Sequence, residues 1–142
     1  EGFRSISEHD DKDLTNSDFS DTSHDSLIDW SSLHNKNRAV SHIDKIELIK
    51  GDATKTIPEY VNNNPHLIIA LLYLDFDIYS PTKTALEHLL PLVPKGGIVA
   101  FDEINCKKWQ GETIAFKECV SLKSVKLEKF SYEPWISYYI VE

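Results

Sequence analysis

The sequence predicts an α/β fold with a mostly parallel sheet and an antiparallel pair of strands at its C-terminal edge. Along the chain, apolar runs that suit buried strands alternate with runs of helical spacing, which is the order of a parallel α/β sheet. The final two strand candidates, 125–130 and 136–141, are separated by a short turn across Glu133 and Pro134. Strands joined so closely are expected to pair antiparallel.

Composition and charge exclude several classes of function. The 142 residues are enough for one domain with a buried core, and the net charge of −8 disfavours nucleic acid because an acidic surface repels phosphates. No apolar run reaches the ~20 residues that span a bilayer, and no signal peptide opens the chain. Cys106 and Cys119 have neither CxxC nor zinc-ligand spacing and suit reduced thiols. We therefore expect a cytoplasmic protein that binds neither nucleic acid nor membrane.

The first half of the chain predicts a polar segment followed by short elements. Residues 4–25 are rich in Ser, Asp, Thr and Asn, which suits a mobile lid or loop. A helix is predicted over 26–40, where apolar residues recur at helical spacing. A short strand is predicted over 46–49, and a short helix over 56–61 has Pro58 near its start.

The second half carries the strongest pattern. Residues 67–74 (LIIALLYL) are almost wholly apolar, as in a strand that is buried on both faces of a parallel sheet. Ser80 and Pro81 suit the cap and the first position of a helix that runs to about residue 90. Residues 98–101 form a second buried strand, and residues 112–122 are a further helix candidate.

Acidic residues follow both of the strongly predicted strands. Asp75 and Asp77 come after the first, and Asp102 and Glu103 come after the second. The carboxyl ends of neighbouring parallel strands lie about 4.8 Å apart, so these carboxylates can converge at the edge where α/β proteins bind ligands. A hard divalent cation such as Mg²⁺ would relieve their repulsion. The alternative is that these acids cap helices or hold loops.

The motifs in this region resemble those of the macrocin O-methyltransferase family, whose members methylate sugar hydroxyls. The resemblance rests on YLDFDIYSPT from Tyr73, LPLVPKGGIVAFDE up to Glu103, and WQGET from Trp109. It implies a Rossmann-like class I methyltransferase sheet, S-adenosylmethionine as methyl donor, and a small-molecule sugar substrate, either a nucleotide-sugar or a glycosylated natural product. The whole of 1–142 would be a single partial domain.

The start of the chain resembles the same family. Residues 1–3 (EGF) are similar to a motif that follows the second sheet strand there, and no G-x-G context is present in the chain. The resemblance therefore implies that the N-terminal strands with the glycine-rich cofactor loop are missing from this sequence. A chain without a starting methionine was either processed or continues upstream.

The resemblance also implies a role for each acid at the strand ends. Asp75, Asp102 and Glu103 would bind the divalent cation, although the family more often has Asp at the position of Glu103. Asp77 would be the general base beside the acceptor hydroxyl. Its alternative is a helix N-terminal charge that interacts with the helix dipole.

The remaining candidate residues lie on the cofactor and substrate sides. Asp52 and Ala53 would lie beside the adenine of S-adenosylmethionine. Tyr79 and Trp109 are candidates for lining the sugar, and the alternative is that they are core or rim aromatics.

Three other functions stay open from the sequence. The apolar run before Asp75-Phe76-Asp77 also fits the first motif of haloacid-dehalogenase-type phosphatases, although Tyr79 departs from their pattern. A metal-dependent DxD glycosyltransferase is the second alternative. The third is an inactive fragment or a binding module, which binding of S-adenosylhomocysteine without catalysis would reveal.

The sheet itself predicts an exposed edge. In the fold that the resemblance implies, strand 67–74 pairs with 98–101 on one side and with an absent cofactor strand on the other. No charge or proline protects that edge. We therefore expect the polypeptide to form a homo-oligomer through this strand, to cover the edge by local rearrangement, or to be part of a longer chain. Strand 46–49 should lie apart from the others, because two strands would normally separate them.

Overall fold

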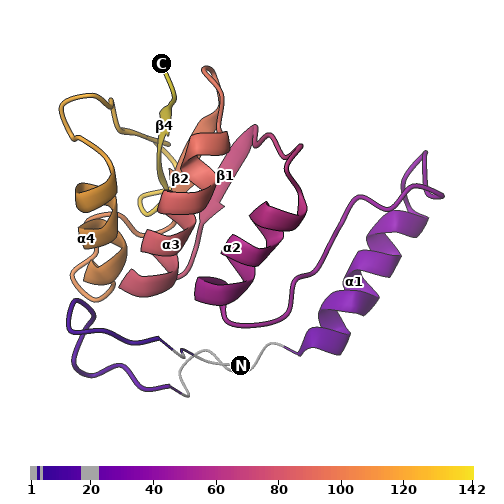
Figure 1. Ribbon diagram of the computed structural model, residues 1–142, viewed down its shortest axis with the longest axis horizontal. Coiled ribbons are helices and arrows are strands. Elements are labelled where there is room, and N and C mark those ends of the chain that lie inside the picture. Colours follow the sequence, from indigo (N-terminus) through magenta and orange to yellow (C-terminus); the bar gives the residue numbers. More distant parts are fainter. Residues whose placement is uncertain (1–2, 4, 17–22) are drawn as a thin grey trace.

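The computed structural model has a four-stranded sheet with helices packed on one face (Figure 1). It describes residues 3, 5–16 and 23–142. Within that part of the chain the elements are α1 (His24–Lys36), α2 (Ala53–Asn63), β1 (Leu71–Leu74), α3 (Tyr79–Leu89), the 3-10 helix η1 (Leu90–Leu92), β2 (Ile98–Phe101), α4 (Gln110–Cys119), β3 (Glu128–Lys129) and β4 (Ser137–Ile140). None of the described helices is long and apolar enough to cross a bilayer.

The strand order is β1-β2-β4-β3. β1 and β2 are parallel, with Leu74 beside Phe101, and α3 forms the crossover between them. β4 is antiparallel to both β2 and β3, with Lys129 beside Ser137. These pairings confirm the predicted α/β sheet with its antiparallel C-terminal edge.

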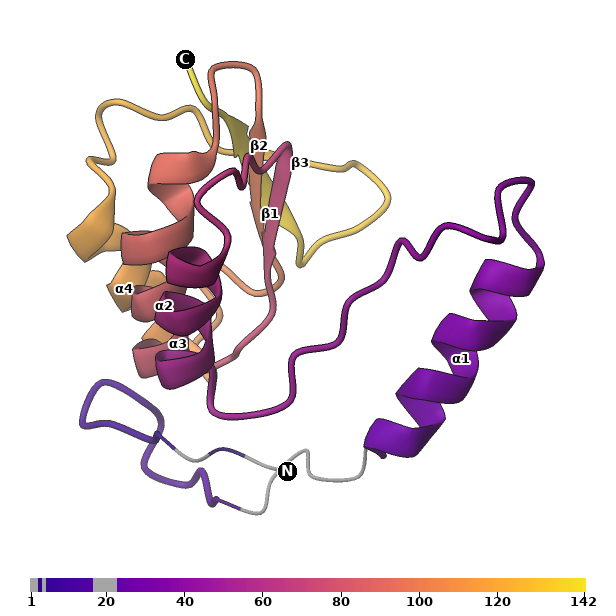
Figure 2. The same cartoon turned by 45° about the vertical axis from the view of Figure 1, so that its right-hand side comes forward.

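The core lies between the sheet and its layer of helices, where α3 packs between α2 and α4 (Figures 1 and 2). Phe101 of β2 and Phe116 of α4 are both fully buried, with ring centroids 4.9 Å apart. Truncating a buried aromatic of this kind to alanine costs about 3–5 kcal/mol. This packing fixes the carboxyl ends of β1 and β2 relative to the start of α4.

Strand β1 is shorter than predicted, and it is not buried on both faces. The ladder begins at Leu71, because the amide of Ile69 donates to the carbonyl of Leu92 at 3.0 Å and not to β2. Leu72 and Leu74 face the helices, whereas Leu71 and Tyr73 are 58% and 44% exposed. The described helices cover only one face of the sheet, so alternate residues of the apolar run on β1 face the solvent.

Helices α2 and α3 begin at residues other than those that the sequence predicts. Ser80 is not a cap: α3 begins at Tyr79, after Ile78, which makes no side-chain cap bond. Helix α2 begins at Ala53, because the Asp52 carboxylate accepts the amide of Thr54 at 3.0 Å. Pro58 therefore lies inside α2 rather than near its start.

Residues 24–50 stand away from the sheet in both views (Figures 1 and 2). Helix α1 ends at Lys36 rather than at residue 40 and buries none of its residues. The predicted strand 46–49 does not form, because a strand needs a hydrogen-bonded neighbour and no described strand lies beside it. Its position apart from the sheet agrees with the sequence prediction. The Tyr60 hydroxyl of α2 donates to Glu47 at 2.7 Å and links this segment to the helical layer.

The predicted lid falls partly outside the described residues. Residues 4 and 17–22 are outside them, and so are residues 1–2 of the motif at the start of the chain. The described part, 5–16, lies at the same end of the molecule as the start of α3 and α4 (Figure 1).

The edge of β1 gives a first testable prediction. Within the described residues β1 has β2 on one side and no strand on the other, and Leu71 is exposed beside that edge. An open apolar edge pairs with other chains. We expect light scattering of the 142-residue polypeptide to detect self-association, which Leu71→Lys should reduce. Leu122→Lys, at an exposed leucine outside the sheet, is the matched control. A monomer at every concentration would contradict this prediction.

Candidate active site

The site is built at the carboxyl ends of β1 and β2, where α3 and α4 also begin (Figure 1). The Asp102 amide donates to the carbonyl of Leu74 at 3.0 Å, so the two strands end side by side. Burial raises the pKa of Asp75, and the nearby charge of Asp102 raises it further. For Asp77 the largest effect is also burial, which raises the pKa; the hydrogen bond from Glu103 lowers it, and the charge of Asp102 raises it. The structure therefore brings together the acids that the sequence placed at two separate strand ends.

Asp77 lies at the tip of a strained turn. Its φ of 62° is in the left-handed region, and the amide of Ile78 donates across it to the carbonyl of Phe76 at 2.6 Å. A residue other than glycine in this region costs on the order of 1 kcal/mol and persists only where its surroundings hold it. Burial raises the pKa of Asp77, while a hydrogen bond from Glu103 lowers it. Strain of this kind clusters at functional sites.

The surroundings of Glu103 favour its protonated form. Burial, followed by its hydrogen bond to Asp77 and the charges of the neighbouring acids, raises the pKa of Glu103 to about 8. At neutral pH a protonated Glu103 can thus donate to Asp77 and compensate its charge. Its Oε2 is buried, and no donor from the described residues is bonded to it.

Glu112 of α4 belongs to the site, and the sequence analysis did not select it. It is fully buried, and its Oε1 accepts the backbone amide of Glu103 at 3.1 Å. The amide of Asn105 donates to Thr113 Oγ1 at 2.8 Å, so the first turn of α4 holds the loop that follows β2. Burial raises the pKa of Glu112 to about 8. The one sequence signal was its place in the WQGET motif.

Asp102 is held by an aromatic neighbour on β1. The Tyr73 hydroxyl donates to Asp102 Oδ1. Burial raises the pKa of Tyr73, and the bond to Asp102 raises it further, so the phenol stays protonated. Tyr73 thereby compensates one of the two negative charges that face Asp75.

The proposed cation ligands have the chemical type of donor atom that a divalent metal ion needs. Among the described residues, the His, Cys, Asp and Glu side chains form no group of three that could hold a metal ion, and Asp102 is bound to Tyr73. The donors are nevertheless the oxygens that Mg²⁺ prefers. Glu103 and Glu112 each have a buried oxygen that accepts no hydrogen bond from the part of the chain that the structure describes, and the neighbouring carboxylates repel one another. A hard cation would supply a partner for these oxygens and relieve the repulsion.

The predicted cofactor residues lie at the start of α2. Asp52 caps the helix through the amide and hydroxyl of Thr54, at 3.0 and 2.7 Å, and these bonds lower the pKa of Asp52. Ala53 is the first residue of the helix. The start of α2 lies at the same end of the molecule as the start of α3 (Figure 1).

The two aromatic candidates are anchored in the protein. Tyr79 donates to Glu118 at 2.7 Å and accepts from Lys83 at 2.7 Å, which ties α3 to α4. Trp109 is only 6% exposed, with the Lys108 ammonium 4.7 Å from its ring centroid. Their anchoring supports the alternative reading as core and rim aromatics.

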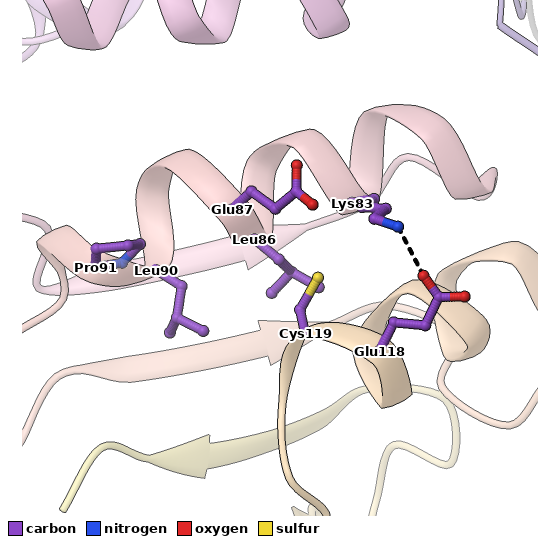
Figure 3. A pocket seen from close by; sticks show the side chains of 7 residues that line it. All are labelled: Lys83, Leu86, Glu87, Leu90, Pro91, Glu118 and Cys119. Atoms are coloured by element: carbon purple, nitrogen blue, oxygen red, sulfur yellow. Dashed lines mark hydrogen bonds and ion pairs between the residues drawn. The ribbon is translucent and has the colours of Figure 1, made fainter.

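A cavity of about 440 Å³ lies between α3 and α4 (Figure 3). The Lys83–Glu118 ion pair, 2.8 Å long, forms one end, and Leu86, Leu90 and Cys119 are among the residues that line it. Burial raises the pKa of Cys119, which makes the thiol a poor nucleophile. None of the strand-end acids lines this cavity, so we place the chemistry at the carboxylates instead.

The buried Glu112 predicts a pH-dependent cost in stability. Its pKa is about 8 in the folded protein against an ordinary 4.5, so between these values the unfolded chain loses a proton that the folded chain keeps. Stability therefore falls as the pH rises through this window, by on the order of 4 kcal/mol. Below pH 4.5 the group has no effect.

Glu112→Gln keeps the acceptor for the Glu103 amide and cannot ionise. We expect it to raise the melting temperature at pH 8 in the presence of a chelator, and to leave it unchanged near pH 4. The exposed Glu87→Gln is the matched control. Equal melting temperatures of the Glu112 variant and the wild type at pH 8 would disprove the assignment.

Comparison with known proteins gives a consistent result. A family model described as "O-methyltransferase" matches residues 32–133. A crystal structure of CalS11, calicheamicin methyltransferase, is 33% identical with a TM-score of 0.89, and the match covers 98% of this chain and 56% of that one. The apo structure of CalS11, titled as a TDP-rhamnose 3′-O-methyltransferase in calicheamicin biosynthesis, is 36% identical with a TM-score of 0.77, covering 82% and 50%. No curated protein sequence matches. The chain thus spans about half the length of the solved structures it matches.

Proposed function

Since this chain belongs to the O-methyltransferase family, we propose that it takes part in transferring a methyl group from S-adenosylmethionine to a sugar hydroxyl. The observation that carries the proposal is the strained Asp77 turn at the sheet edge, with Glu103 hydrogen-bonded to its carboxylate. The similarity to a protein titled TDP-rhamnose 3′-O-methyltransferase supports a nucleotide-sugar as the acceptor.

In the proposed reaction, Asp77 is the general base. A sugar hydroxyl is a poor nucleophile near neutral pH, so removing its proton as the oxygen attacks lowers the barrier. Burial has already raised the pKa of Asp77, which brings the carboxylate closer to the strength that a base needs. The remaining task of the protein is to hold the hydroxyl in line with the methyl group.

Asp75, Asp102 and Glu103 are the residues that would hold a divalent cation such as Mg²⁺. When bound there, the cation would supply a positive charge that lowers the pKa of the acceptor hydroxyl. Asp52 and Ala53 are proposed to lie beside the adenine of the cofactor, at the start of α2. Tyr79 and Trp109 remain proposals for the rim of the sugar site.

Two measurements test the proposed function. The first is transfer of a labelled methyl group from S-adenosylmethionine to TDP-rhamnose, which we expect to see. The second is the melting temperature with S-adenosylhomocysteine, which should rise because a ligand that binds only the folded state stabilises it. A raised melting temperature without transfer to TDP-rhamnose or other sugar nucleotides would identify a binding module instead. Phosphatase and glycosyltransferase activities are disfavoured by the family match.

A further inference from the structure

Asp10 is a buried acid in a mostly polar segment, 5–16, whose other residues are exposed or half-buried. Its side chain is only 4% exposed, and its Oδ1 accepts the backbone amide of Tyr79 at 2.7 Å, across 69 positions of sequence. Carboxylates are rarely buried unless their charge is compensated. Here the partner is the first amide of α3, where a negative charge also interacts favourably with the helix dipole.

Gly111 makes room for this carboxylate at the start of α4. A Cβ at position 111 would lie 2.0 Å from Asp10 Oδ1 and 2.5 Å from the Tyr79 nitrogen. Any larger residue would therefore displace the carboxylate or the start of α3. The place of Gly111 in the WQGET motif is thus explained by close packing against Asp10.

The other carboxylate oxygen closes the turn that contains Asp10. Oδ2 accepts the amide of Ser7 at 2.8 Å and its hydroxyl at 2.9 Å, and the Asp10 amide donates to the Ser7 carbonyl at 3.2 Å. The His9 ring lies against Tyr79, with centroids 4.4 Å apart. Residues 7–10 therefore dock on α3 as one unit.

The anchored amide lies two positions after Asp77. Between them, Ile78 is 2% exposed and donates to Phe76 across the strained turn. Helix α3 has no side-chain cap of its own, so Asp10 takes that place from a distant part of the chain. The segment that directly follows Asp77 is therefore held by two contacts, the packing of Ile78 and the hydrogen bond from the Tyr79 amide to Asp10.

We infer that Asp10 is a positioning residue, which holds the Asp77 turn in its reactive orientation through the backbone of Tyr79. The inference rests on the proposed role of Asp77 as the base. Small misplacements of a reacting group cost up to about 100-fold in rate. Loss of Asp10 should therefore lower kcat and leave acceptor binding largely intact.

The test compares Asp10→Ala, Asp10→Asn and the control Asp13→Ala, which removes an exposed charge from the same segment. In Asp10→Ala we expect kcat for methyl transfer to fall about 10- to 100-fold with less than about a 3-fold change in KM for the sugar acceptor. Hydrogen exchange at the Tyr79 amide should become faster. Asp10→Asn keeps an oxygen for that amide, so it should restore most of both properties.

Several results would overturn the inference. A kcat for Asp10→Ala equal to that of Asp13→Ala would do so, and so would a loss that appears in KM alone. Unchanged Tyr79 exchange in both Asp10 variants would also remove it, even if the alanine variant folds poorly. If the wild type transfers no methyl group, the proposed function fails, and Tyr79 exchange still decides whether Asp10 anchors the turn.

Discussion

Replacing Asp77 with asparagine is expected to lower kcat for methyl transfer by about 10²- to 10⁴-fold, the usual contribution of a positioned general base. Asparagine retains the shape of the side chain but cannot take a proton. The left-handed backbone at position 77 also favours the substitution, because asparagine tolerates this region as well as aspartate does. The loss should therefore come from chemistry and not from misfolding.

The pH profile provides the check. Because burial raises the pKa of Asp77 above its ordinary 3.8, wild-type activity should fall as the pH drops through that raised value. The residual activity of Asp77→Asn should lack this decline. Asp29→Asn, at an exposed position in α1, is the control for loss of a charge. A kcat for Asp77→Asn equal to that of the control would exclude Asp77 as the base.

Replacing Asp102 with asparagine is expected to weaken Mg²⁺ binding by about 100-fold or more, since even residues that only support a metal ligand contribute 10- to 100-fold. The charge of Asp102 raises the pKa values of Asp75, Asp77 and Glu103, so Asp102 is central to the proposed cation site. Removing its charge also removes part of the attraction for the cation.

Calorimetric titration with Mg²⁺ measures this effect. Tyr73→Phe is the matched variant, because it frees Asp102 from its hydrogen bond and should leave Mg²⁺ affinity equal or higher. The same Mg²⁺ affinity in Asp102→Asn and the wild type would rule out the proposed cation site. Loss of affinity in Tyr73→Phe would instead make the phenol part of that site.

Local sequence patterns were enough to predict the central β1-α3-β2 unit. The apolar runs that end at Leu74 and Phe101 and the helical spacing between them are short-range features, so the order and direction of the strands followed. The acids directly after the strands were placed at one edge for the same reason. A residue that follows a strand must lie where that strand ends, whatever the rest of the fold does.

Features that depend on a distant partner could not be predicted in this way. The start of α3 is set by Asp10 rather than by Ser80, because the acceptor for the Tyr79 amide comes from 69 positions away. Segment 46–49 has the composition of a strand, yet no described strand pairs with it.

The sequence by itself determined that the four acids directly after β1 and β2 gather at the sheet edge, and the tertiary structure added Glu112 and decided the environment that each acid has. Glu112 resembles an ordinary helix glutamate until α4 packs against the loop after β2 and buries it. Asp77 is one of several acids until its backbone enters a left-handed turn, which Asp10 anchors through the amide of Tyr79. Burial, strain and pKa depend on atoms that meet only when the chain has folded, so only the structure could assign them.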